Sequence, residues 1–152
     1  VSNYKIKTNT TGSKIDLIAR KAFKEIDLDY PHGTGHGVGY FLNVHEGPCG
    51  ISRGNKTKFL EGMVISNEPG YYENNRFGIR IENLIMVKKK NKATFFEELT
   101  LVPIDKTLIE KDLLNLNEIR WLNNYHLKVF TSLKKFMSKD ELPELKNYCS
   151  NI

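Results

Sequence analysis

The segment HGTGHGVG, residues 32–39, has glycine at every second position and cannot favour a regular helix. Each glycine costs a helix about 1 kcal/mol relative to alanine, because its backbone has more freedom to lose. The same freedom lets a main chain pass close to a ligand or take a positive φ angle. We therefore expect a loop that leads into a strand at residues 40–45, whose alternation places Leu42 on one face and His45 on the other.

The glycine spacing also bears on two enzyme classes. The pattern is G-x-G-x-G-x-G, not G-x-G-x-x-G, and no Gly-Lys-Ser or Gly-Lys-Thr occurs, so a phosphate-binding loop is disfavoured. The G-x-S-x-G turn of serine hydrolases is absent from the sequence. Cys49 stands near His45 but belongs to no motif of a cysteine hydrolase.

The composition is that of a soluble globular domain, with 152 residues, 39% hydrophobic residues and a formal net charge of +5. This charge excess is too small to favour a nucleic-acid binder, and the lysines around Asn91 are typical of a solvated hairpin tip. No segment resembles a signal peptide or a membrane span. Because Cys49 and Cys149 are far apart and predict no disulfide, we expect a cytoplasmic protein.

Hydrophobic periodicity predicts strands and helices on both sides of the glycine segment. Strands are expected at 63–68, ending before Pro69, at 78–87 and at 95–102. Within GIRIEN, the alternation places Ile79 and Ile81 on a buried face and Arg80 and Glu82 on the other.

Three helices are predicted from caps and from apolar residues spaced three and four apart. The first spans 14–26, with Ser13 as its cap and Asp16 answering it. The second begins near 116 and runs to 136, with His126 on its apolar stripe, where we interpret it as a structural residue. The third, at 140–148, is capped by Ser138.

HGTGHGVG, NEPGYY and GIRIEN hold the residues that could carry chemistry. Each alone has an ordinary explanation: a surface histidine, a turn residue at Glu68, or an exposed Arg80–Glu82 salt bridge worth under about 1 kcal/mol. Together, one imidazole and two carboxylates form a mixed nitrogen and oxygen ligand set that suits Mn, Zn or Co. Remaining histidines, such as His32 and His45, would then be free to move protons or stabilise a tetrahedral intermediate.

HGTGHGVGYFLNVHEGP, NEPGYY and FGIRIENLIMV together closely resemble the Xaa-Pro aminopeptidases of the pita-bread metallopeptidase group. The segments TTGSKIDLIARKAF, LTLVPID and EIRWLNNYH extend the resemblance over almost the whole chain. It implies an α+β fold: the C-terminal half of a pita-bread domain with antiparallel strands at 1–104, and a helical C-terminal extension packed on it at 105–152.

The resemblance also implies roles for individual residues. His36, Glu68 and Glu82 are implied as metal ligands, with Glu82 bridging two ions and Glu68 also acting as the base for the attacking water. His32 and His45 are implied to be catalytic and substrate-binding groups that are not ligands. Arg80 is implied to support the site and the substrate, and Tyr72, more weakly, to line the pocket.

The implied reaction removes an N-terminal residue that precedes proline, with two divalent ions, most often Mn although Zn or Co would suit, activating a bridging water. A bond to proline lacks an N–H and has a restricted φ, so a dedicated pocket is expected. The implied partners are a peptide with proline at its second position and a second copy in a homodimer; neither a nucleic acid nor a membrane is expected.

The chain departs from the family in its aspartates. Two further ligands are expected from a D-x-G-x-x-Y strand and a D-x-T-R segment, and neither motif occurs. With three of five ligands, metal binding would be weak. Since the chain also begins with Val1, we expect it to be the C-terminal part of a longer enzyme, inactive without the missing N-terminal portion.

Two alternatives stay open. A prolidase would cleave Xaa-Pro dipeptides on the same scaffold, but its histidine loop usually ends closer to HD than to HEGP, and the tail WLNNYH also argues against it. An inactive pita-bread module would bind peptides or proteins. Retention of the five residues with implied metal or proton roles weighs against that alternative, since a binding module has no chemical need for them: His32, His36, His45, Glu68 and Glu82.

Overall fold

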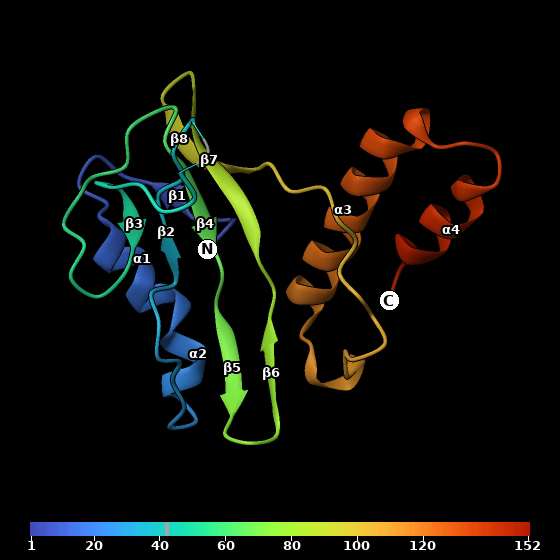
Figure 1. Ribbon diagram of the computed structural model, residues 1–152, viewed down its shortest axis with the longest axis horizontal. Helices are drawn as coiled ribbons and strands as arrows, with labels where there is room; N and C mark the ends of the chain where they lie inside the picture. The colour runs from blue at the N-terminus through green and yellow to red at the C-terminus, as the bar shows by residue number, and fades with distance from the viewer. Residues whose placement is uncertain (42) are drawn as a thin grey trace. The chain divides into compact units, whose positions relative to one another are not determined.

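A computed structural model describes residues 1–41 and 43–152, and the chain forms two units in it, Val1–Thr100 and Leu101–Ile152 (Figure 1). The first unit is built on a four-stranded antiparallel sheet in the order β1-β8-β7-β4. The strands are β1 (Lys5–Ile6), β4 (Val64–Asn67), β7 (Asn83–Lys90) and β8 (Ala93–Glu98). The strand predicted at 63–68 is thereby confirmed, and that predicted at 95–102 begins and ends earlier.

Alternation along the strands gives the sheet one buried face. In β7, Ile85 and Val87 are fully buried and are paired with Ile65 of β4 and Phe96 of β8. The β7–β8 turn contains Asn91 with φ of 56°, which confirms the predicted lysine-rich hairpin tip. Eight buried apolar residues make up the core of this unit: Ile6, Ile15, Ile51, Phe59, Ile65, Ile85, Val87 and Phe96.

A second hairpin extends beyond this sheet, where β5 (Gly70–Glu73) pairs with β6 (Phe77–Arg80) (Figure 1). The single strand predicted at 78–87 is therefore wrong, because the chain breaks it into β6 and β7 at residues 81 and 82. The predicted burial of Ile79 and Ile81 is also wrong, as they are 44% and 47% exposed. Within the described chain β6 has only β5 as a partner, so its side chains do not lie against the core of the main sheet.

The glycine segment contains a short strand, β2 (Gly35–His36), which pairs with β3 (Gly50–Ile51). The strand predicted at 40–45 is wrong for its described residues, which form a loop, and Leu42 lies outside them. Gly39 N donates to Asn43 O at 2.8 Å and Glu46 N donates to Gly37 O at 2.9 Å. These bonds turn the chain back so that β3 can reach β2.

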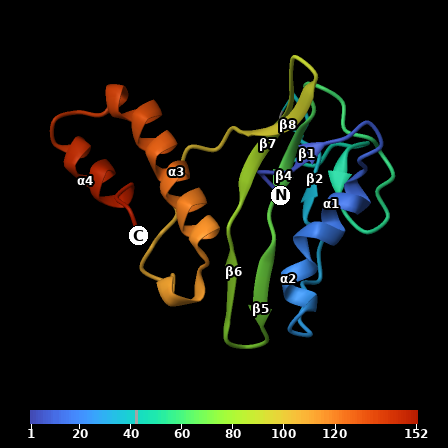
Figure 2. The same ribbon diagram turned by 180° about the vertical axis from the view of Figure 1, so that it is seen from behind.

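The predicted first helix exists as two shorter helices, α1 (Gly12–Ala19) and α2 (Lys21–Lys24), separated by Arg20. α1 packs against β3, and both views show these helices beside β2 and β3 (Figures 1 and 2). Ser13 does not cap the helix, because the helix begins at Gly12 and Thr11 holds the cap position. Gly12 N and Ser13 N donate to the carbonyls of Thr57 and Asn55 at 3.3 and 2.8 Å. Asp16 is fully buried and has another role, described below.

The second unit consists mainly of α3 (Leu116–Leu133) and α4 (Glu141–Tyr148), with short 3-10 turns at Lys111–Leu113 and Lys134–Phe136. A capping box of Asn115 and Glu118 starts α3, and Ser138 and Glu141 bond to each other ahead of α4, as predicted for Ser138. The buried cluster of this unit contains Tyr125, Val129, Leu145 and Cys149.

His126 is fully buried on α3, and its Nε2 accepts from Ile104 N at 3.1 Å, which agrees with its interpretation as a structural residue. None of the helices among the described residues has both the length and the apolar character needed to cross a membrane.

Candidate metal centre

His36, Glu68 and Glu82 come together at one place in the first unit. Each offers a ligand atom, and these atoms lie within 4.8 Å of one another. His36 belongs to β2, Glu68 follows β4, and Glu82 lies between β6 and β7. His36 Nε2 lies 3.3 Å from Glu68 Oε1. Three separate stretches of sequence thus supply the three side chains that the resemblance implies as ligands.

Ser66 connects two of these side chains. Its hydroxyl accepts from His36 N at 2.9 Å and donates to Glu68 Oε1 at 2.7 Å. Glu68 N donates in turn to Thr34 O at 2.8 Å, so β2 and β4 are linked on both sides of Ser66. A Cβ on Gly35 would lie 1.9 Å from Ser66 O, which explains why glycine precedes His36.

The backbone fixes the tautomer of His36. Its Nδ1 lies 2.9 Å from Gly37 O, and a carbonyl oxygen can only accept, so Nδ1 carries the proton. In the neutral imidazole, Nε2 then has a lone pair directed toward Glu68. A backbone carbonyl on the other ring nitrogen is the usual arrangement for a histidine that binds metal.

The donor chemistry fits a divalent metal. One imidazole nitrogen with carboxylate oxygens suits Mn, Zn or Co, while thiolate is absent from the group. Glu68 is 7% exposed, and a buried carboxylate needs a cationic partner. Arg80 supplies one, since its Nη1 donates to Glu68 Oε2 at 3.0 Å.

A directed chain of hydrogen bonds leads from Arg80 to His32. Arg80 Nε donates to Tyr72 Oη at 2.8 Å, and His32 Nδ1 donates to Gly33 O at 2.7 Å. With its proton on Nδ1, a neutral His32 accepts at Nε2 from the Tyr72 hydroxyl, 2.8 Å away. The hydrogen bond to Tyr72, together with the charges of Glu68 and Glu82, raises the pKa of Arg80, although burial acts to lower it.

His45 reaches the site from the loop after β2, not from a strand end as predicted. Its ring centroid lies 4.0 Å from that of His36. A cavity of about 280 Å³ opens between these groups. Its walls are formed by His32, Gly33, Gly35, His36, His45, Glu68 and Arg80.

Sequence reasoning missed Ser66 and Thr34, which join the strands beneath the cavity. Ser66 could have been found, because it stands two residues before Glu68 and therefore on the same side of β4. Thr34 gave no such signal, since its partner Asp16 is 18 residues away.

Models of protein families match the chain over most of its length. Residues 3–89 match the model described as metallopeptidase family M24, and residues 92–152 match the C-terminal region of peptidase M24. The chain belongs to metallopeptidase family M24. The resemblance stated from the motifs is thus confirmed, as is the α+β fold of a C-terminal pita-bread half with a helical tail.

Individual relatives are similar over nearly the whole chain. A probable Xaa-Pro aminopeptidase P of Botryotinia fuckeliana is 50% identical over 146 residues, which are 88% of this chain and 22% of the relative. One of Laccaria bicolor is 45% identical over 156 residues, or 94% of this chain and 24% of the relative. The chain therefore spans about a quarter of the length of the curated relatives it matches.

Solved structures give the same picture. An X-prolyl aminopeptidase from Caenorhabditis elegans, described as a cytosolic enzyme with a di-nuclear active site, matches with a TM-score of 0.88 and 39% identity, over 100% of this chain and 26% of that one. A prolidase from Pyrococcus furiosus matches with a TM-score of 0.54 and 36% identity, over 62% of this chain and 26% of its own.

Proposed function

We propose that this chain supplies the histidine- and glutamate-bearing part of the active site of a metal-dependent Xaa-Pro aminopeptidase. The observation that carries the proposal is the convergence of His36, Glu68 and Glu82 within 4.8 Å beside a cavity lined by His32, His45 and Arg80. This set contains metal ligands, a base and proton carriers in one place. The substrate is a peptide with proline at its second position.

Two divalent ions, Mn in our proposal with Zn or Co also suited, would be held by His36, Glu68 and Glu82 and would activate water and polarise the scissile carbonyl. The di-nuclear site in the description of the C. elegans relative supports the number of ions. The ligand set of this chain supports the metal class.

The chain's own side chains would handle protons and charge. Glu68 takes the proton of the attacking water at a carboxylate oxygen, and Arg80, hydrogen-bonded to Oε2, keeps that carboxylate charged and oriented. His45, beside His36, and His32 face the cavity, where they contact the substrate and the oxyanion of the tetrahedral intermediate. Tyr72 links Arg80 to His32 and so fixes both relative to the substrate.

Three ligands are fewer than two metal ions require, so we propose that further ligands, two aspartates in our expectation, come from outside these 152 residues. The share of the relatives that the chain spans supports this. The 152-residue chain by itself would then bind metal weakly and have no turnover. The missing N-terminal portion of the enzyme would be its partner.

Further parts of the proposal concern organisation. We propose a catalytic part at 1–104 and a helical extension packed on it at 105–152. The two family matches, which meet near residue 90, and the two structural units support a division in this region.

A cytoplasmic location is supported by the C. elegans relative and by the two free cysteines. The homodimer rests on the resemblance to cytosolic enzymes.

Turnover and metal content of the complete natural polypeptide test the proposal. We expect two bound divalent ions per chain and release of glycine from Gly-Pro-Pro, with little cleavage of the Gly-Pro dipeptide. Cleavage of the dipeptide alone would favour a prolidase. No bound metal and no turnover would contradict an enzyme and favour a peptide-binding module. The 50% and 45% identities to two probable Xaa-Pro aminopeptidases P support the aminopeptidase.

A further inference from the structure

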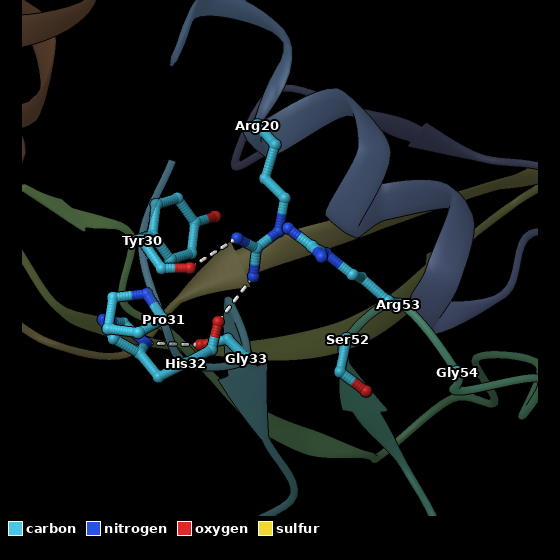
Figure 3. Close-up of a pocket in the computed structure, with 8 residues that line it drawn as sticks. All are labelled: Arg20, Tyr30, Pro31, His32, Gly33, Ser52, Arg53 and Gly54. Carbon is cyan, nitrogen blue, oxygen red and sulfur yellow. Dashed lines mark hydrogen bonds between the residues drawn. The ribbon is translucent and has the colours of Figure 1, made fainter. Parts of the chain in front are cut away.

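Arg20, between α1 and α2, lies behind the candidate active site and is only 3% exposed. It borders a second cavity of about 340 Å³ that Arg53, Ser52 and residues 30–33 also line (Figure 3). Figure 3 shows its guanidinium group directed at the backbone that carries His32. Burying a guanidinium group is unfavourable unless each N–H finds a partner, so its contacts indicate what it holds.

Two of these contacts are backbone carbonyls on either side of Pro31. Arg20 Nη1 donates to Tyr30 O at 2.9 Å, and Nη2 donates to His32 O at 2.5 Å (Figure 3). The guanidinium also lies over the Tyr30 ring, 3.9 Å from its centroid. The segment therefore receives from one side chain the donors that a neighbouring strand would otherwise provide.

Two carboxylates hold the guanidinium group itself. Arg20 Nε donates to Asp16 Oδ2 at 2.9 Å, and Nη1 pairs with Asp29, which also pairs with the more exposed Arg53. Although burial acts to raise it, these hydrogen bonds and charges keep the pKa of Asp29 below its usual value. The two arginines and two aspartates balance in charge, so the cavity is not built to attract an anion.

A second set of hydrogen bonds, through Asp16, holds the segment just after His32. Thr34 donates from its hydroxyl to Asp16 Oδ1 at 2.6 Å, so Tyr30 Oη must donate to the Thr34 oxygen. The Thr34 carbonyl accepts from Glu68 N at 2.8 Å. The backbone at residues 30, 32 and 34 is thus tied to Arg20 directly or through Asp16.

We propose that Arg20 is a positioning residue for the active site, which holds His32 in place through the carbonyls of Tyr30 and His32. This inference rests on the proposed function, because it matters for catalysis only if His32 contacts the substrate. His36 and Glu68 are joined by Ser66 without Arg20, so loss of the guanidinium moves His32 more than it moves the ligands. Lysine cannot replace Arg20, since an ammonium lacks the planar fork that reaches two carboxylates and two carbonyls.

A double-mutant cycle in the complete, metal-loaded polypeptide tests this. Arg20→Lys lowers turnover of Gly-Pro-Pro by about ten- to a hundredfold, the cost of a misplaced group, and adds little in a His32→Ala background. Arg53→Lys, which alters the same Asp29 pair but no carbonyl contact, is the matched control and keeps wild-type turnover. Equal losses from Arg20→Lys in both backgrounds would overturn the proposal.

A second readout does not depend on turnover. The ¹⁵N and ¹H resonances of the His32 ring shift in Arg20→Lys and not in Arg53→Lys, while those of His126 stay fixed. Unchanged His32 resonances would overturn the proposal even if the polypeptide proves to be no peptidase. Should Arg20→Lys fail to fold, Asp29→Asn, at a side chain 33% exposed, must shift the same resonances for the proposal to stand.

Discussion

Glu68, just after β4, and His36 of β2 lie close together, with Oε1 of the carboxylate 3.3 Å from Nε2 of the imidazole. The proton on His36 Nδ1 is directed at Gly37 O, so in the neutral imidazole a lone pair on Nε2 faces a carboxylate oxygen. Two electron-rich atoms at this separation favour a cation near both. The second carboxylate oxygen, Oε2, accepts from Arg80, which orients the carboxylate. Oε1 is then the oxygen that faces a metal.

Glu68→Gln should therefore remove most activity without unfolding the protein. Glutamine has nearly the same shape but cannot take the proton of the attacking water, so we expect kcat to fall by about 10²- to 10⁴-fold. Assays with Gly-Pro-Pro on the complete polypeptide check this. Glu97→Gln is the control, because Glu97 forms a partly exposed pair with Lys88 at 3.6 Å. Comparable activity of the two variants would exclude Glu68 as the base.

Ser66→Ala should weaken metal binding although Ser66 is no ligand. The hydroxyl orients Glu68 and holds the backbone of His36, and losing such a supporting contact typically costs about 10- to 100-fold in affinity. Titration of Mn²⁺ by calorimetry measures the change. Ser13→Ala is the matched control, since among the described residues its hydroxyl bonds to Thr11 Oγ1, at 3.0 Å, and not to a residue of the metal centre. Equal affinity of both variants would refute the role assigned to Ser66.

The sequence predicts the candidate site better than the fold around it. His32, His36, Glu68 and Arg80 are found together because their motifs are short and local, whereas strand limits depend on pairing partners far along the chain. Asp16 shows the difference. The sequence predicts that it answers a helix cap, but its partners are Arg20 and, 18 residues away, Thr34. The spacing of Asp16 and Arg20 by four residues is visible in the sequence, but neither the burial of the pair nor its contact with Thr34 is.

The alternating glycines are a second example. The prediction that they let the main chain approach a ligand remains a prediction, but the structure shows that they let it approach other segments of its own backbone. A Cβ at Gly35 would lie 1.9 Å from Ser66 O, and one at Gly37 would lie 2.0 Å from Glu46 O. Both are backbone oxygen atoms of segments that lie close only in the folded chain. The periodicity of hydrophobic residues in the sequence carries no information about such contacts.

Gly35→Ala should consequently destabilise the first unit and disturb the metal centre. The added methyl group can be accepted only if β2 moves away from β4, at a cost of about 1–3 kcal/mol. Thermal unfolding should show a lower Tm, and Mn²⁺ affinity should fall with it. Gly54→Ala serves as the control, because nothing lies within 4 Å of its added Cβ. An unchanged Tm for Gly35→Ala would mean that β2 and β4 are not packed this closely.

His126 should make the stability of the second unit depend on pH. Burial lowers its pKa, as does the positive charge of Lys106, against a backbone hydrogen bond with Ser150 that acts to raise it. The unfolded chain therefore takes up a proton at a higher pH than the folded one. The stabilisation is complete above the unfolded pKa of about 6.5 and is lost as the pH falls from there toward the folded pKa, by at most about 1.4 kcal/mol per pH unit for one proton.

Urea unfolding followed by fluorescence of Trp121, the single tryptophan of the chain, reports on α3 and measures this slope between pH 7.5 and 5. His126→Gln retains an acceptor for Ile104 N but does not titrate, so its unfolding free energy should change less over the same range. His45→Gln, at an exposed position in the first unit, should keep the wild-type slope. An equal slope in His126→Gln and wild type would assign the pH dependence to other groups.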